Sequence, residues 1–233
     1  MNARAAADVA LWSAATIGLY QLARLVHARL RTPWLSPLLV APLALGAVLV
    51  ALGVAYPRYR DGAGWLVTML GPTTVAFAVP IYRERALLRR HWPVVLGGSV
   101  LASVTAIATS WWLATALGLD GVVRQSLVPR SVSTPFAMEV SRRLGGAPDL
   151  TASFVVATGV LGAVLGELML ARLPIRSPLA RGAVFGAGAH GAGTARAYQR
   201  DPTEGAVSAL IMVTMGVLNV ACAPLVAWFL PGG

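Results

Sequence analysis

Residues 186–196 read GAGAHGAGTAR, and they interrupt a chain that is otherwise built largely of long apolar runs. A second polar interruption, PRSVSTPFAME, occupies residues 129–139. Glycine this dense permits an unwound helix or a close approach of two backbones. Backbone that is not fully helical survives at membrane depth only where protein or a wet cavity surrounds it. We therefore expect broken or re-entrant helical segments at 126–145 and 178–200.

The composition of the whole chain supports a membrane setting. It has 233 residues, of which 57% are hydrophobic and only 12% are charged. Soluble domains carry about 25% charged residues. So few charges could not cover the surface of a soluble fold, and disordered chains are poor in hydrophobic residues. These figures exclude a soluble globular protein and a disordered one.

Apolar runs between the charges predict six full transmembrane helices. A spanning helix needs about 20 apolar residues, because each residue rises 1.5 Å across a core of about 30 Å. We expect an all-α polytopic membrane protein with a single membrane domain, in which 1–60 form scaffold helices and 61–233 carry substrate. The expected spans are 9–24, 32–57, 62–82, 92–119, 150–171 and 205–233.

Arginine placement indicates the topology. All 19 basic residues are arginine, and three of them follow the first apolar run, whereas Arg4 stands alone before it. That flank charge is the reverse of a signal peptide's, so we expect a retained helix. The positive-inside rule places both termini outside and the 83–90 loop in the cytoplasm. The counts are 12 arginines against 7 if the two polar segments re-enter and 11 against 8 if they cross, which leaves both alternatives open.

A weak internal repeat relates three parts of the chain. Thr74, Thr134 and Thr194 lie at 60-residue intervals, and each precedes a polar turn and an apolar span. Paired broken helices within repeats are typical of secondary transporters. If the first element of each unit re-enters, neighbouring units are inverted; if it crosses, they are parallel.

The first polar segment offers an anion site. Ser131, Ser133 and Thr134 are N-cap residue types, and Pro135 suits the first turn of a helix. A helix that begins near Ser133 would aim free N–H groups and the positive end of its dipole at a small anion. Ordinary capping at the membrane surface is the alternative.

The second polar segment offers His190, Thr194 and Arg196, and Gly191 and Gly193 lie between the first two of them. It matches the dinucleotide pattern G-x-G-x-x-G, but no strand precedes it, so we reject that meaning. A guanidinium can hold a carboxylate through two parallel hydrogen bonds, and an ionisable group at membrane depth suggests function. The alternatives are a packing histidine and an arginine that contacts headgroups.

Other polar residues are secondary candidates. Thr73 and Thr74 follow a Gly-Pro pair and would form a third wall of the site, and Glu139 would pair with arginine or carry a proton, as His190 would. Asn219 suits helix–helix hydrogen bonding. Signatures of enzymes are absent, and the single Cys222 with scattered histidines excludes the common metal spacings. We expect no enzyme activity, no cofactor, no metal and no nucleic-acid partner.

The two polar motifs, together with LLVAP at 38–42 and LGPTTVAFAVPIY at 70–82, resemble the LrgB/CidB family over about residues 10–230. Ser133 and Ala192 depart mildly from the family pattern, which usually has threonine and isoleucine there. The resemblance implies a bacterial inner-membrane protein, often paired with a small LrgA-like partner. It also implies either antiholin-like control of murein hydrolases and lysis, or transport of small monocarboxylates, as in the related plastidal glycolate/glycerate translocator.

The sequence favours the transporter, because a passive pore needs no broken helices that carry hydroxyls, His and Arg. The hypothesis is alternating-access transport of glycolate, glycerate, lactate or pyruvate. Ser131, Ser133 and Thr134 would bind the carboxylate from one side, and His190, Thr194 and Arg196 from the other. The alternatives are an antiholin-like regulator or pore subunit and a membrane enzyme that acts on a lipid-linked substrate. A homodimer would suit a scaffold with mobile units.

Overall fold

Every regular element is helical in the part of the chain that this computed structural model describes, residues 3–30, 32, 35–76 and 78–230. The chain divides into two compact units, residues 1–75 and 76–233. The candidate site lies in the second unit.

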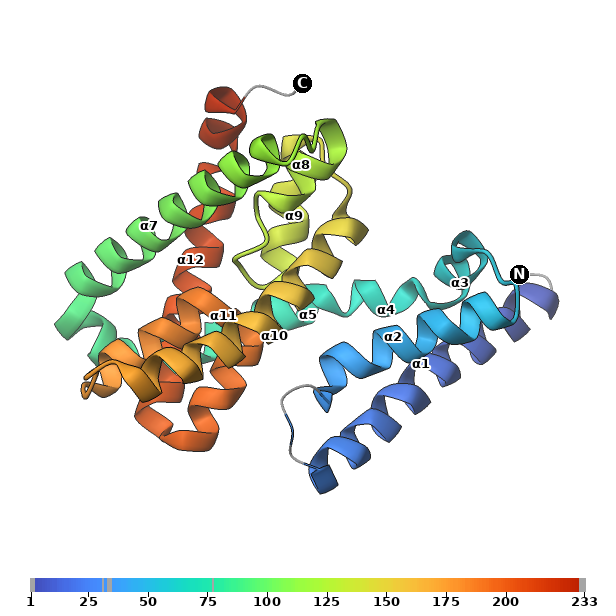
Figure 1. The fold of residues 1–233 in the computed structure, drawn as a ribbon, viewed down its shortest axis with the longest axis horizontal. Helices are drawn as coiled ribbons and strands as arrows, with labels where there is room; N and C mark the ends of the chain where they lie inside the picture. Colours follow the sequence, from blue (N-terminus) through green and yellow to red (C-terminus); the bar gives the residue numbers. More distant parts are fainter. Residues whose placement is uncertain (1–2, 31, 33–34, 77, 231–233) are drawn as a thin grey trace. The chain divides into compact units, whose positions relative to one another are not determined.

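The first unit is a small helical assembly around α1 (Figure 1, blue). Its aromatic residues hold α3 and α4 against α1: the rings of Trp12 (α1) and Tyr59 (α3) meet edge to face at 6.0 Å, and Trp65 Nε1 (α4) donates to Ser13 Oγ (α1) at 2.7 Å. The helices are α1 (Ala3–Leu30), α2 (Pro37–Ala51), α3 (Tyr56–Ala63), α4 (Trp65–Thr68) and α5 (Leu70–Ala76), which reaches the boundary between the units.

The second unit contains the long helices and both polar segments. Its helices are α6 (Ala78–Arg83), α7 (Arg85–Ala116), α8 (Gly121–Leu127), α9 (Thr134–Leu144), α10 (Pro148–Arg172), α11 (Pro178–Arg200) and α12 (Pro202–Phe229).

The predicted count of six full spans is not confirmed. Among the described residues, four helices (α1, α7, α10 and α12) are long and apolar enough to cross a membrane. Helix α2 has 15 residues, which is about 22 Å. The predicted span at 62–82 is interrupted at Gly64, which ends α3, and at Met69, which ends α4; Pro72 in the first turn of α5 lacks the N–H that a helix continuous with α4 would need.

The segment at 178–200 folds back on itself at His190. The backbone of α11 is helical on both sides of this residue, which has φ 37° and ψ −118°. A β-carbon at Gly193 would lie 2.5 Å from the carbonyl oxygen of Phe185, eight positions earlier, so the two limbs lie side by side. At the base, Glu204 pairs with Arg181 on one limb at 2.6 Å and with Arg200 on the other at 3.5 Å. The segment is a helical hairpin with His190 at its tip, and we call it re-entrant in the sense that both limbs end at the same level, beside Glu204.

The segment at 126–145 also returns to its starting level. Helix α8 ends at Leu127, a non-helical linker runs through 128–133, and α9 leads back. Beyond α9, the Ala147 N–H donates to Ser126 Oγ at 2.8 Å, and Thr151 Oγ1 donates to the Ser126 carbonyl at 3.0 Å. This segment is a second re-entrant loop, with its linker as the inward part.

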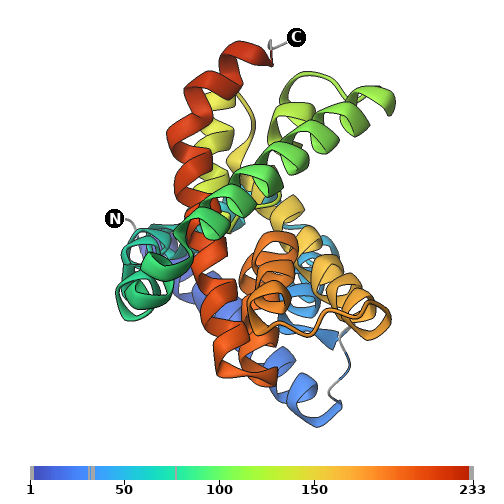
Figure 2. The same cartoon turned by 90° about the vertical axis from the view of Figure 1, so that its left-hand side faces the viewer.

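The two re-entrant segments approach from opposite ends of α10. Near its N-terminus, α10 bonds to the first loop through Thr151 and Ser126; near its C-terminus, Glu167 pairs with Arg196 of the α11 hairpin. Helix α12 contacts them in reverse order: Ser208 bonds to Thr194, and the Val220 carbonyl accepts from Arg143 of α9. Figure 2 shows α12 (red) beside orange α11 along one half and yellow α9 along the other. A re-entrant loop followed by a long helix therefore occurs twice, in opposite directions.

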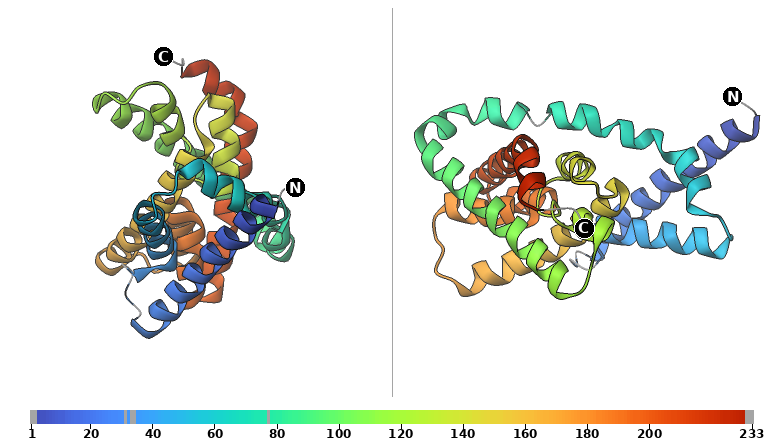
Figure 3. Two further views of the ribbon diagram at one scale, coloured as in Figure 1. Left: turned by 90° about the vertical axis from the view of Figure 1, so that its right-hand side faces the viewer. Right: turned by 90° about the horizontal axis from the view of Figure 1, so that it is seen from above.

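Helix α7 completes this unit. It packs against α12 and α8; Figure 2 shows it (green) crossing α12 (red), and the right-hand view of Figure 3 shows the same helices from above. Asn219 of α12, 4% exposed, donates through Nδ2 to Ser103 Oγ of α7 at 2.8 Å, as a helix–helix hydrogen bond. A buried apolar cluster that includes Val132, Phe136, Val155 and Leu210 fills the space between α9, α10 and α12.

Because α10 packs closely on the α11 hairpin, we expect a single added methyl group at this contact to lower the stability of the protein. A β-carbon at Gly162 would collide with the backbone carbonyl of Gly188, which cannot rotate away. Gly162→Ala should therefore destabilise the protein by about 1–3 kcal/mol, the usual cost of overpacking. Gly97→Ala in α7 is the control, because a methyl group there meets nothing within 4 Å. Thermal unfolding in detergent measures both, and equal melting temperatures would contradict this packing.

Candidate functional site

The two breaks in the polar segments meet near the middle of α10. Arg130, in the linker of the first loop, donates through Nη1 to Thr158 Oγ1 at 3.4 Å. The His190 ring, at the tip of the hairpin, lies close to Arg130. It also covers Gly159 so closely that a β-carbon there would lie 3.1 Å from Cε1. Thr158 and Gly159 are close to the midpoint of the 25-residue α10, so the site lies at mid-depth.

His190 is held in an unusual state. Its φ of 37° is the positive value that non-glycine residues rarely adopt, and strained backbone of this kind clusters at functional sites. The side chain is 3% exposed, and Nε2 has no hydrogen-bond partner among the described residues. A buried imidazole nitrogen without a partner is costly unless something else binds there.

Ser133 begins α9, as the sequence predicted. It is the N-cap residue, followed by Thr134 and Pro135 in the first turn. Its hydroxyl makes no capping hydrogen bond, although the residue is only 6% exposed and Oγ is buried without a partner in the described chain. The start of α9 thus combines a free hydroxyl with the positive end of a helix dipole, an arrangement that suits an anion.

Arg130 is the charged group that the sequence analysis missed. It is half-buried, and within the described residues no carboxylate pairs with it. Other arginines of this unit have acidic partners; for example, Arg181 pairs with Glu204, and Arg196 pairs with Glu167. The positive-inside count included Arg130 together with the arginines of the loops and so gave it no role of its own. The sequence feature that could have identified Arg130 is its position inside the polar segment at 129–139.

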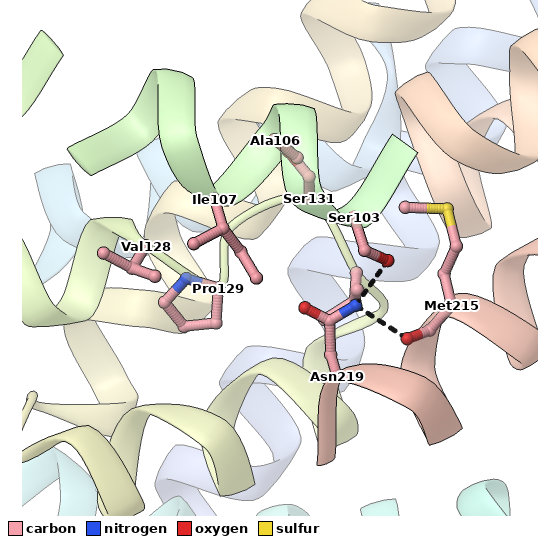
Figure 4. Close-up of a pocket in the computed structure, with 9 residues that line it drawn as sticks. Ser103, Ala106, Ile107, Val128, Pro129, Ser131, Met215 and Asn219 are labelled. Atoms are coloured by element: carbon pink, nitrogen blue, oxygen red, sulfur yellow. Dashed lines mark hydrogen bonds between the residues drawn. The ribbon is translucent and has the colours of Figure 1, made fainter. Parts of the chain in front are cut away.

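Ser131 lies on a different side of the linker. It lines a shallow depression together with Ser103, Met215 and Asn219 (Figure 4). In that view the Asn219 Nδ2 bonds to Ser103 Oγ and to the Met215 carbonyl, both at 2.8 Å. Arg130 contacts Thr158 of α10, so the two neighbouring side chains contact different helices.

The returning limb of the hairpin carries the other predicted residues, and they do not join Arg130. Thr194 is buried and shares a 2.9 Å hydrogen bond with Ser208 Oγ of α12. Arg196 is exposed, and it pairs with Glu167 and donates to Gln199. Gly193 packs the two limbs together, and Gly191 is exposed beside the tip.

The remaining candidates are more peripheral. Glu139 pairs with Arg142 at 2.8 Å and with Arg143 at 3.0 Å, which agrees with the salt-bridge alternative. The side chains of Thr73 and Thr74 lie outside the described part of the structure, so their role stays a prediction. Among the described residues, no cluster of His, Cys, Asp and Glu could hold a metal ion.

The strained tip predicts an inverted effect of substitution. In an ordinary helix, glycine is less stable than alanine by about 1 kcal/mol. At position 190 alanine keeps the strain and glycine relieves it, so His190→Gly should be more stable than His190→Ala by about 1–3 kcal/mol. Chemical unfolding of the two variants measures the difference. The ordinary order, with alanine more stable, would show that the backbone at the tip is not strained.

Comparisons with known proteins agree with the sequence resemblance. The LrgB-like family matches residues 16–229. The chain is 37% identical to the uncharacterized protein YwbG of Bacillus subtilis, over 92% of this chain and 96% of YwbG. It is 32% identical to the uncharacterized protein YxaC of the same organism, with 91% and 93% covered. It is 29% identical to the holin-like protein CidB of Staphylococcus epidermidis, with 90% and 92% covered. No solved structure matches the chain.

Proposed function

Because this chain belongs to the LrgB-like family, whose relatives cover nearly its whole length, we propose that it is a secondary transporter of small monocarboxylates. The substrates are of the glycolate, glycerate, lactate or pyruvate class. The observation that carries the proposal is the meeting of two opposed re-entrant segments at mid-depth, where buried polar groups on both sides lack partners.

Alternating access follows from this arrangement. Each re-entrant segment reaches the site from one end of α10, so each closes one route to it. Opening one route while the other stays closed would expose the site to each side in turn, as in transporters with opposed broken helices. The unpartnered His190 Nε2 can accept a proton from the substrate side, which gives proton coupling a place in the cycle.

The bacterial inner membrane is the proposed location. Re-entry of both segments corresponds to the distribution of 12 arginines inside against 7 outside. Both termini and the base of the first loop then lie in the periplasm, and the 83–90 loop and the base of the hairpin lie in the cytoplasm. Pairing with a small LrgA-like protein and formation of a homodimer belong to the same proposal.

A holin-like regulator or pore subunit is the second candidate, favoured by the names of the CidB relatives. It predicts leakage of many solutes that depends on a partner and that carboxylates do not inhibit. Buried groups without partners at the site favour a bound substrate instead, because a water-filled pore would leave them exposed.

Uptake by the purified protein in liposomes tests the proposal. We expect saturable uptake of a labelled monocarboxylate, inhibited by others of its class and changed by a pH gradient. Ser133→Ala should reduce uptake about tenfold, since it removes a hydroxyl from the site. Ser153→Ala is the control, because that exposed hydroxyl only bonds to the Asp149 carbonyl of its own helix. Unselective leakage from the liposomes, or equal uptake by both variants, would contradict the proposal.

A further inference from the structure

Arg130 has no acidic partner among the described residues, and it lies where the two re-entrant segments meet. The guanidinium of Arg130 has one described hydrogen bond, to a neutral hydroxyl at 3.4 Å. A charged group partly withdrawn from water is costly unless it is paired, and at membrane depth the cost is greater. The missing partner is therefore an anion that this part of the chain does not supply.

Two further groups point to the same anion. Ser133 lies three residues after Arg130, and its buried hydroxyl begins a helix of 11 residues. His190 lies against Arg130 from the opposite segment, with a buried nitrogen that lacks a partner. Each of these residues is more than nine-tenths buried. A fixed cation, a hydroxyl donor and an imidazole nitrogen are together the groups that recognise a carboxylate.

We propose that Arg130, rather than Arg196, binds the substrate carboxylate and limits the substrate to a single negative charge. This rests on the proposed function, because it names the group that recognises the substrate of that same site. Arg196 is already neutralised by Glu167, and it is exposed. One arginine balances one carboxylate. A second carboxylate at this depth would face no second arginine among the described residues and could be balanced only by a protonated His190, so dicarboxylates should bind more weakly.

Binding of small acids to purified protein in detergent tests the assignment independently of transport. The probes are glycolate, its neutral amide glycolamide, and the dicarboxylate tartronate, with thermal stabilisation as the readout. Wild-type protein should bind glycolate and should discriminate against both of the others. Arg130→Gln should weaken glycolate binding at least tenfold and abolish the preference over glycolamide. This preference depends on charge recognition, so a merely structural role would not remove it.

Two controls and one milder variant keep the test decisive. Arg196→Gln and Arg142→Gln remove arginines that pair with acids away from the site, and glycolate affinity should stay within twofold. Arg130→Lys keeps the charge but loses the planar fork, so its affinity should fall about three- to tenfold. If Arg130→Gln does not fold, the glycolate affinity of Arg130→Lys tests the role of Arg130 instead.

The outcomes separate this inference from the proposed function. Unchanged glycolate affinity and charge preference in the folded Arg130 variants would overturn the role of Arg130, even if wild-type liposomes transport monocarboxylates. Loss of binding in Arg196→Gln alone would do the same. Wild-type protein that binds glycolate in this charge-dependent way but transports nothing would contradict the proposed function and leave Arg130 as the anion ligand. A wild-type protein that prefers tartronate would overturn the limit of one charge.

Discussion

Backbone N–H and C=O groups cannot be left unpaired in hydrocarbon, and the second unit is organised around two places where the chain breaks this rule. The linker at 128–133 and the reversal at His190 both interrupt helical hydrogen bonding. Each is surrounded by protein: α10 lies along both, α12 packs on both re-entrant segments, and α7 closes the linker side through Ser103. The breaks are tolerated because they are buried against each other and against these helices.

Close helix contact is what makes that burial achievable. Gly162 lets α10 approach the backbone of the hairpin, and Gly193 lets the two limbs of the hairpin approach each other. Glu204 holds both limbs at the base through two arginines. The tip then has little freedom to relax, which explains how a non-glycine residue can keep a positive φ there. The backbone strain at His190 and the unpaired charge of Arg130 both raise the free energy of the folded protein. A bound anion would offset that increase.

Local features of the sequence predicted where the two helical segments are broken, but they did not predict which residues are in contact at the breaks. Capping residues near Ser133 and glycines around His190 are signals read from neighbouring positions, and both segments are broken in the structure. The pairing of Arg196 with Glu167, 29 positions away, depends on how α10 packs on the hairpin. The same packing leaves Arg130 without an acidic partner in the described part of the chain. Apolar content alone also predicted one uninterrupted span at 62–82, where glycine and proline divide the chain into short helices.

Entry of the two re-entrant segments from opposite membrane faces is the central claim, and labelling of single cysteines tests it most directly. Arg142→Cys and Gln199→Cys, both at exposed positions near the bases, would be made separately in a Cys222→Ser chain. In right-side-out membrane vesicles, an impermeant maleimide should label position 142 from outside and position 199 only after the vesicles are opened. Labelling of both positions from the same side would contradict the account.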